Sequence, residues 1–103
     1  MGETTAAAVI RIDNMLTAAV LLALGLASSV TGYGYPGARR VRLEVECEAG
    51  DERKARDVAQ RCDQGMLQGI MVDVGKYQAA FRQVSNIVDE ARAGASKERM
   101  VVR

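Results

Sequence analysis

The sequence predicts a mainly α-helical protein with an N-terminal apolar helix that spans a membrane or is fully buried. Three observations support this prediction: residues 14–38 carry no charge, the 103 residues include one proline, and the aromatic content is 4%. The apolar content comes from Ala, Val, Leu, Ile and Met, which suits helices better than a sheet sandwich. We expect an N-terminal flank (1–13), the apolar helix (14–35), a loop and strand (36–50), an amphipathic helix (51–93) and a tail (94–103).

The apolar helix is centred on residues 15–30, MLTAAVLLALGLASSV. A bilayer core about 30 Å thick needs about 20 helical residues, and residues 31–35 extend the run into the interface, where Tyr33 and Tyr35 suit the headgroup layer. Leu22 would then contact lipid near the middle of the span. One alternative is a helix buried on all sides between subunits of a filament or virus particle. A cleaved signal peptide is disfavoured, because the N-terminus lacks a net positive start.

A glycine pattern of the form G-x-G-x-x-G follows the apolar run, at Gly32, Gly34 and Gly37. A dinucleotide-binding turn with this spacing follows a strand and opens a helix. Here the preceding run has a helical composition, Pro36 removes a backbone donor, and a strand-like segment comes next. We therefore expect these glycines to end a helix, with Gly32 and Gly34 adopting positive φ.

Residues 40–48, RVRLEVECE, alternate strictly between apolar and charged side chains, which predicts a half-buried strand. A single strand needs a partner for its free backbone groups. The chain offers a candidate short strand at 100–102, Met-Val-Val, and a neighbouring subunit is the alternative.

Helical composition continues from residue 51 to residue 93, with glycines at 65, 69 and 75 that predict a kink near 65–75. An unbroken helix would be about 65 Å long, so either the glycines fold it back or the strand pairs between subunits. From residue 70 onward apolar residues alternate in steps of four and three, as in a coiled-coil seam. Packing against the chain's own core is the alternative. The predicted interaction residues are Leu22 and the seam residues Ile70, Val74, Tyr77, Phe81, Val84 and Val88.

Fourteen residues separate the two cysteines, Cys47 and Cys62, which is not a zinc-binding spacing. They are either buried thiols or a disulfide between the strand and the following helix. If the apolar run spans a membrane, Arg39, Arg40 and Arg42 place the C-terminal part in the cytoplasm. Reducing conditions there would keep both thiols free.

No catalytic constellation is recognisable. The chain has no histidine, which removes the commonest general base and metal ligand, and its serines have no activating partner in a suitable motif. The 14 basic and 13 acidic residues nearly cancel, so a nucleic-acid partner is not expected. We expect no enzyme activity, metal, cofactor or small-molecule substrate. The predicted function is a single-span membrane protein that serves as a structural or accessory subunit of an oligomer. The alternative is a non-membrane structural subunit of a filament or virus particle, including a phage virion or lysis component.

Overall fold

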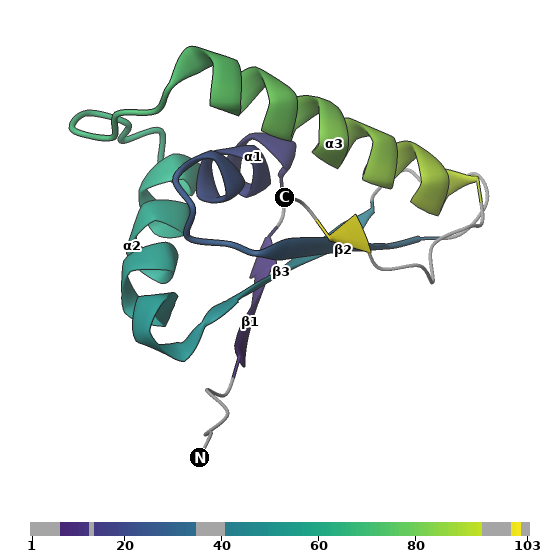
Figure 1. The fold of residues 1–103 in the computed structure, drawn as a ribbon, viewed down its shortest axis with the longest axis horizontal. Helices are drawn as coiled ribbons and strands as arrows, with labels where there is room; N and C mark the ends of the chain where they lie inside the picture. Colours follow the sequence, from purple (N-terminus) through teal and green to yellow (C-terminus); the bar gives the residue numbers. More distant parts are fainter. Residues whose placement is uncertain (1–6, 13, 35–40, 94–99, 102–103) are drawn as a thin grey trace.

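The chain folds into a four-stranded antiparallel sheet with its helices packed against one face (Figure 1). The computed structural model describes residues 7–12, 14–34, 41–93 and 100–101. The strands lie in the order β1–β3–β2–β4. The elements along the chain are β1 (Ala7–Ile12), α1 (Met15–Ala23), β2 (Ser29–Tyr33), β3 (Arg42–Glu48), the 3₁₀ turn η1 (Ala49–Asp51), α2 (Glu52–Asp63), α3 (Val74–Arg92) and β4 (Met100–Val101).

The predicted mainly α fold with one apolar helix over 14–35 is wrong. That segment contains α1, a helix of 9 residues, followed by the strand β2. The segment expected to be an N-terminal flank contains β1. Among the residues that the structure describes, no helix combines the length and apolar character needed to cross a bilayer.

Gly25 explains why the apolar run does not continue as one helix. Its φ of 77° lies in the left-handed region that glycine adopts without a Cβ penalty. The Gly25 N–H donates to the Leu22 carbonyl at 3.0 Å, and the Leu26 N–H donates to the Leu21 carbonyl at 2.9 Å. This pair of bonds is a Schellman motif, which satisfies the last carbonyls of α1 and turns the chain toward β2.

We expect Gly25→Ala to destabilise the protein by about 1 kcal/mol, because alanine is strained at this positive φ. No atom lies within 4 Å of an added Cβ, so the effect is conformational rather than steric. Gly50→Ala is the matched control, since that position is equally open and its φ is not positive. Urea unfolding monitored by circular dichroism measures both variants, and equal midpoints would contradict this account of the turn.

The strand predicted over 40–48 corresponds to β3, which lies inside the sheet. It pairs with β1 on one side and β2 on the other, so it needs no neighbouring subunit as a partner. The C-terminal segment considered as its partner does form a short strand, β4, but β4 pairs with β2 instead. Ile10, Val45 and Val30 lie in one row across the three strands.

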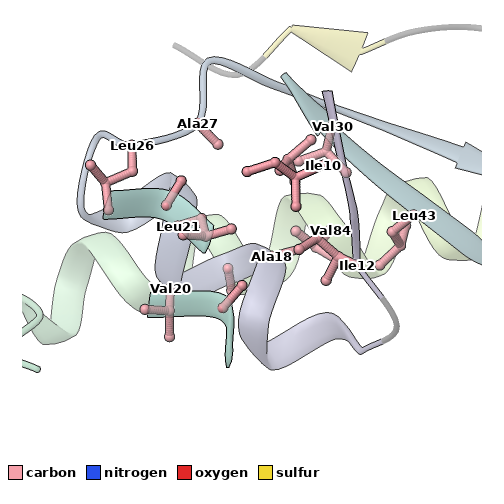
Figure 2. Close-up of a cluster of buried hydrophobic side chains, with 14 of the residues drawn as sticks. Ile10, Ile12, Ala18, Val20, Leu21, Leu26, Ala27, Val30, Leu43 and Val84 are labelled. Carbon is pink, nitrogen blue, oxygen red and sulfur yellow. The ribbon is translucent and has the colours of Figure 1, made fainter. Parts of the chain in front are cut away.

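The hydrophobic core lies between this row and the helices, as Figure 2 shows. The centre of α1 contributes Leu21, the sheet contributes Val30 and Val45, and α3 contributes Val84, all of them essentially inaccessible to solvent. Much of the uncharged run that the structure describes, including residues 17–21, is therefore buried in the core of its own chain. Its hydrophobicity serves the folding of this domain.

The helical segment predicted over 51–93 consists of two helices, α2 and α3, with non-helical chain between residues 64 and 73. Gly65 and Gly69 both have positive φ in this connection. The side chain of Asp63 accepts hydrogen bonds from Asn14 Nδ2 at 3.0 Å and Thr17 Oγ1 at 3.3 Å. These bonds join the end of α2 to the start of α1, so the chain folds back on itself.

Two glycines of the G-x-G-x-x-G pattern, Gly32 and Gly34, allow the chain to pack closely against α3. Gly32 lies in β2, where an added Cβ would come within 2.9 Å of Ile87 Cγ2. At Gly34 an added Cβ would lie 3.2 Å from the backbone oxygen of Ala91. The prediction that these two residues adopt positive φ at a helix end is wrong, because the positive-φ glycines of the described chain are Gly25, Gly65 and Gly69. Gly37 lies outside the described residues.

Candidate interaction site

The chain between α2 and α3 forms a loop that projects from the body of the molecule (Figure 1). Met66 is 57% exposed, Leu67 44%, Met71 86% and Val74 69%. Isolated exposed apolar residues are normal on protein surfaces. Four large ones within nine consecutive residues are not, and such patches mark sites of interaction. We call residues 66–74 the apolar loop.

Local hydrogen bonds hold the apolar loop in one conformation. Gly65 ends α2 with a Schellman motif, in which its N–H donates to the Cys62 carbonyl and the Met66 N–H donates to the Arg61 carbonyl at 2.8 Å. The Ile70 N–H donates to the Leu67 carbonyl at 3.1 Å, and Gly69 has the positive φ that a type II turn requires at its third position.

Two side chains fix the loop to its flanking helices. The Arg61 guanidinium donates a hydrogen bond to the Gln68 carbonyl. At the other end Asp73 caps α3, since its Oδ2 accepts the Lys76 N–H at 2.9 Å. The loop therefore presents its methionines from a preorganised backbone, which lowers the entropy lost on binding.

The charges around the apolar loop favour a protein partner over a lipid surface. Residues 64–72 carry no charge, and aspartates at 63 and 73 bound them. Segments that insert into a membrane interface are typically flanked by Lys and Arg, which attract anionic headgroups. Aspartates at both ends of the loop have the opposite effect. Methionine, by contrast, is common at adaptable protein-binding surfaces.

The predicted seam residues differ in burial, and all of them except Val74 belong to the chain's own core or pack against it. Val84 and Val88 are buried, whereas Val74 is exposed and Ile70 lies before the start of α3. Tyr77 and Phe81 are partly buried and stack obliquely, with ring centroids 5.8 Å apart. The buried residues of α3 are Ala80, Val84, Ile87, Val88 and Ala91, so the buried stripe shares Val84 and Val88 with the predicted seam.

A groove lies between the end of α1 and the N-terminal half of α3. Its volume is about 450 Å³, and most of its lining is apolar, including Leu22, Leu24, Ala27 and Ala79. Leu22, predicted to face lipid, is thus partly buried against the core and lines this groove. Lys76 and Gln83 are its polar members, and Gln83 Oε1 is buried without a hydrogen-bond partner in the described residues.

The two cysteines are buried and free, Cys47 in β3 and Cys62 in α2. Burial raises the pKa of the Cys47 thiol above its ordinary value of 9.0, and the Glu52 carboxylate raises it further. The pKa of Cys62 is raised mainly by burial and then by Asp63, while a hydrogen bond from Thr17 acts the other way. Both groups are therefore protonated near neutral pH, and a protonated buried thiol is a poor nucleophile.

Nothing in the described residues gathers three or more His, Cys, Asp or Glu side chains into a group that could hold a metal ion. Comparison of the chain with protein-family models, curated proteins and solved structures gives no significant match.

The sequence-predicted interaction residues include only part of the apolar loop. They cover Ile70 and Val74 but omit Met66, Leu67 and Met71. A usable signal is present in the sequence, because residues 64–72 combine glycines at 65 and 69 with no charge and with an aspartate on each side. Glycines that break a helix inside an apolar stretch indicate an apolar loop, and loops generally run over the protein surface.

Proposed function

We propose that this protein is a structural subunit of an assembly of its own copies, in which the apolar loop of one copy packs into the groove between α1 and α3 of another. The observation that carries the proposal is the preorganised apolar loop, whose residues 66–72 carry no charge and whose Met71 is 86% exposed. The proposal keeps the alternative drawn from the sequence, a non-membrane subunit of a filament or virus particle. The single-span hypothesis rests on a helix over 14–35 that the structure does not contain.

The loop and the groove are complementary in size and character. The groove of about 450 Å³ is within the range of sites that take an apolar side-chain cluster. Methionine has three rotatable side-chain bonds beyond Cα and fills irregular apolar spaces. A projecting apolar patch and an apolar groove at different places on one surface let identical copies associate head to tail.

Self-association should depend on Met71 and on the groove residue Ala79. We expect Met71→Glu and Ala79→Glu each to lower the weight-average mass in sedimentation equilibrium, because each buries an unpaired charge in the contact. Gln68→Glu is the matched control for the loop, since Gln68 is exposed beside the methionines. Gln78→Glu is the control for α3, where Gln78 lies next to Ala79 and does not line the groove.

Mixing the two defective variants gives the sharper test. Met71→Glu retains an intact groove and Ala79→Glu retains an intact loop, so their mixture restores one productive contact per pair of copies. The mixture should therefore show a higher weight-average mass than either variant alone. A wild-type chain that remains monomeric over the whole concentration range would contradict the proposal, and so would a mixture that behaves as the average of its components.

A further inference from the structure

The strand β1 is an edge strand without the usual protection against pairing with another chain. It pairs with β3 on one side, and no other described strand pairs with it. Natural edge strands are commonly guarded by prolines, bulges or several charges. β1 is AAVIRI, six residues with one charge, and it pairs with β3 in an unbroken register. Val9, on the sheet face opposite the core, is 52% exposed.

We propose that β1 pairs antiparallel with β1 of a second copy across a two-fold axis at Val9, so that two sheets join into one. In this register each Val9 lies opposite the partner's Val9, and Ala7 lies opposite the partner's Arg11. Residues that face each other in an antiparallel pair point to the same side of the sheet. The two Val9 side chains therefore cover each other, and Arg11 is kept away from the partner's Arg11.

The charges on the exposed sheet face fit this register. In one copy Arg11 lies opposite Glu44 and Ala7 lies opposite Glu48. Neither Arg11 nor Glu48 forms an ion pair within the described residues. In the joined sheet the partner's Arg11 lies opposite Ala7 of the first copy, and Ala7 lies opposite Glu48 of the same copy. The small methyl group of Ala7 leaves room for the partner's guanidinium to extend across β1 toward Glu48. The two-fold axis repeats this pair, so the interface holds two such contacts between opposite charges.

Alternative registers fit less well. A shift of one residue would set the core-facing residues of one strand against the open-face residues of the other. A two-fold axis at Arg11 would place two guanidinium groups opposite each other, which is destabilising. An axis at Ile10 would leave Val9 opposite the partner's Arg11 and Glu48 without a charged neighbour from the second copy. Of these registers, the one with its axis at Val9 covers Val9 with the partner's Val9 and places the partner's Arg11 near Glu48.

Cross-linking of single cysteine variants tests the pairing and its register. Across the axis, Val9→Cys places two thiols on strands about 5 Å apart, within the range of a disulfide. Diamide, as the oxidant, takes up the two electrons and two protons released when the bond forms. Ala7→Cys and Arg11→Cys are matched controls, because each is about 13 Å from its own symmetry copy. An equal mixture of these two controls should cross-link, since residue 7 faces residue 11 of the partner.

The expected result is a cross-linked fraction about tenfold higher for Val9→Cys, and for the mixture, than for either control alone, because only the facing positions come within the range of a disulfide. The wild-type chain, with Cys47 and Cys62 buried, sets the background. Equal cross-linking of Val9→Cys and Ala7→Cys, no cross-linking of Val9→Cys, or failure of the mixture to cross-link would each overturn the proposal.

The pairing is independent of the apolar loop, so Val9→Cys should cross-link equally in a Met71→Glu background. If the Met71→Glu background loses association but Val9→Cys still cross-links, the strand pairing is supported. If Val9→Cys fails to cross-link while the association through the apolar loop remains, the strand pairing is rejected and the loop contact is not.

Discussion

Replacing Leu21 by alanine should destabilise the protein by about 2–5 kcal/mol, the range for a large-to-small change at a fully buried core position. Leu21 has no accessible surface and belongs to the cluster of buried hydrophobic side chains drawn in Figure 2. Small domains have a total stability of about 5–15 kcal/mol. The variant should therefore lose a large part of its stability, visible as a lower midpoint in urea unfolding.

Leu16→Ala is the control for this prediction, because it removes the same atoms from the same helix. Leu16 is 38% exposed, so its replacement should change the free energy of unfolding by less than about 1 kcal/mol. If Leu21 and Leu16 contacted lipid or a partner chain rather than this core, the two variants would behave alike. Similar midpoints would thus contradict the placement of α1.

Gly32→Ala should destabilise the protein by about 1–3 kcal/mol through overpacking between β2 and α3. An added Cβ would lie 2.9 Å from Ile87 Cγ2 and 3.4 Å from the Ile87 backbone oxygen. The side chain can move only by displacing its buried neighbours, and the backbone oxygen moves only with the helix. The free energy of unfolding, measured by chemical denaturation, should fall accordingly.

A double-mutant cycle with Ile87→Ala isolates this contact. Ile87→Ala alone opens a cavity, since Ile87 is 3% exposed. In the double variant the methyl group added at position 32 partly fills the space that Cγ2 has left. The two destabilisations should therefore sum to more than that of the double variant, with a coupling of about 0.5–3 kcal/mol. If the two effects simply added, the Ile87 side chain would not be what limits the space for a side chain at position 32.

The strand β3 could be predicted from the sequence because one of its faces is buried and the other is charged, which produces a clear alternation. The break between α2 and α3 could be anticipated for a similarly local reason, the glycines at 65 and 69. The apolar run could not be interpreted correctly from its hydrophobicity. Consecutive residues are buried both in α1, at 17–21, and in β2, at 29–30, so the run shows no periodicity that separates helix from strand.

Gly25 is the local signal that divides the apolar run. A left-handed glycine followed by Leu26 is the pattern of a Schellman motif with its apolar contact, since Leu21 and Leu26 are both buried. β1 is harder to predict, because AAVIRI is short and ambiguous without knowledge of β3 beside it. The candidate site poses a different difficulty: the uncharged stretch with its two glycines indicates an apolar loop, but the degree to which Met71 is exposed depends on how α2 and α3 are placed.

The central structural claim is that the apolar run divides into a helix and a strand paired inside this chain's own sheet. Solution NMR tests it most directly, through NOEs between the Hα atoms of β2 and β3. We predict cross-strand Hα–Hα NOEs at alternate pairs of the register that joins Val30 to Val45 and, within the apolar run, helical NOEs only before Gly25. Helical NOEs running unbroken from Met15 past Val30, without cross-strand NOEs, would contradict the account.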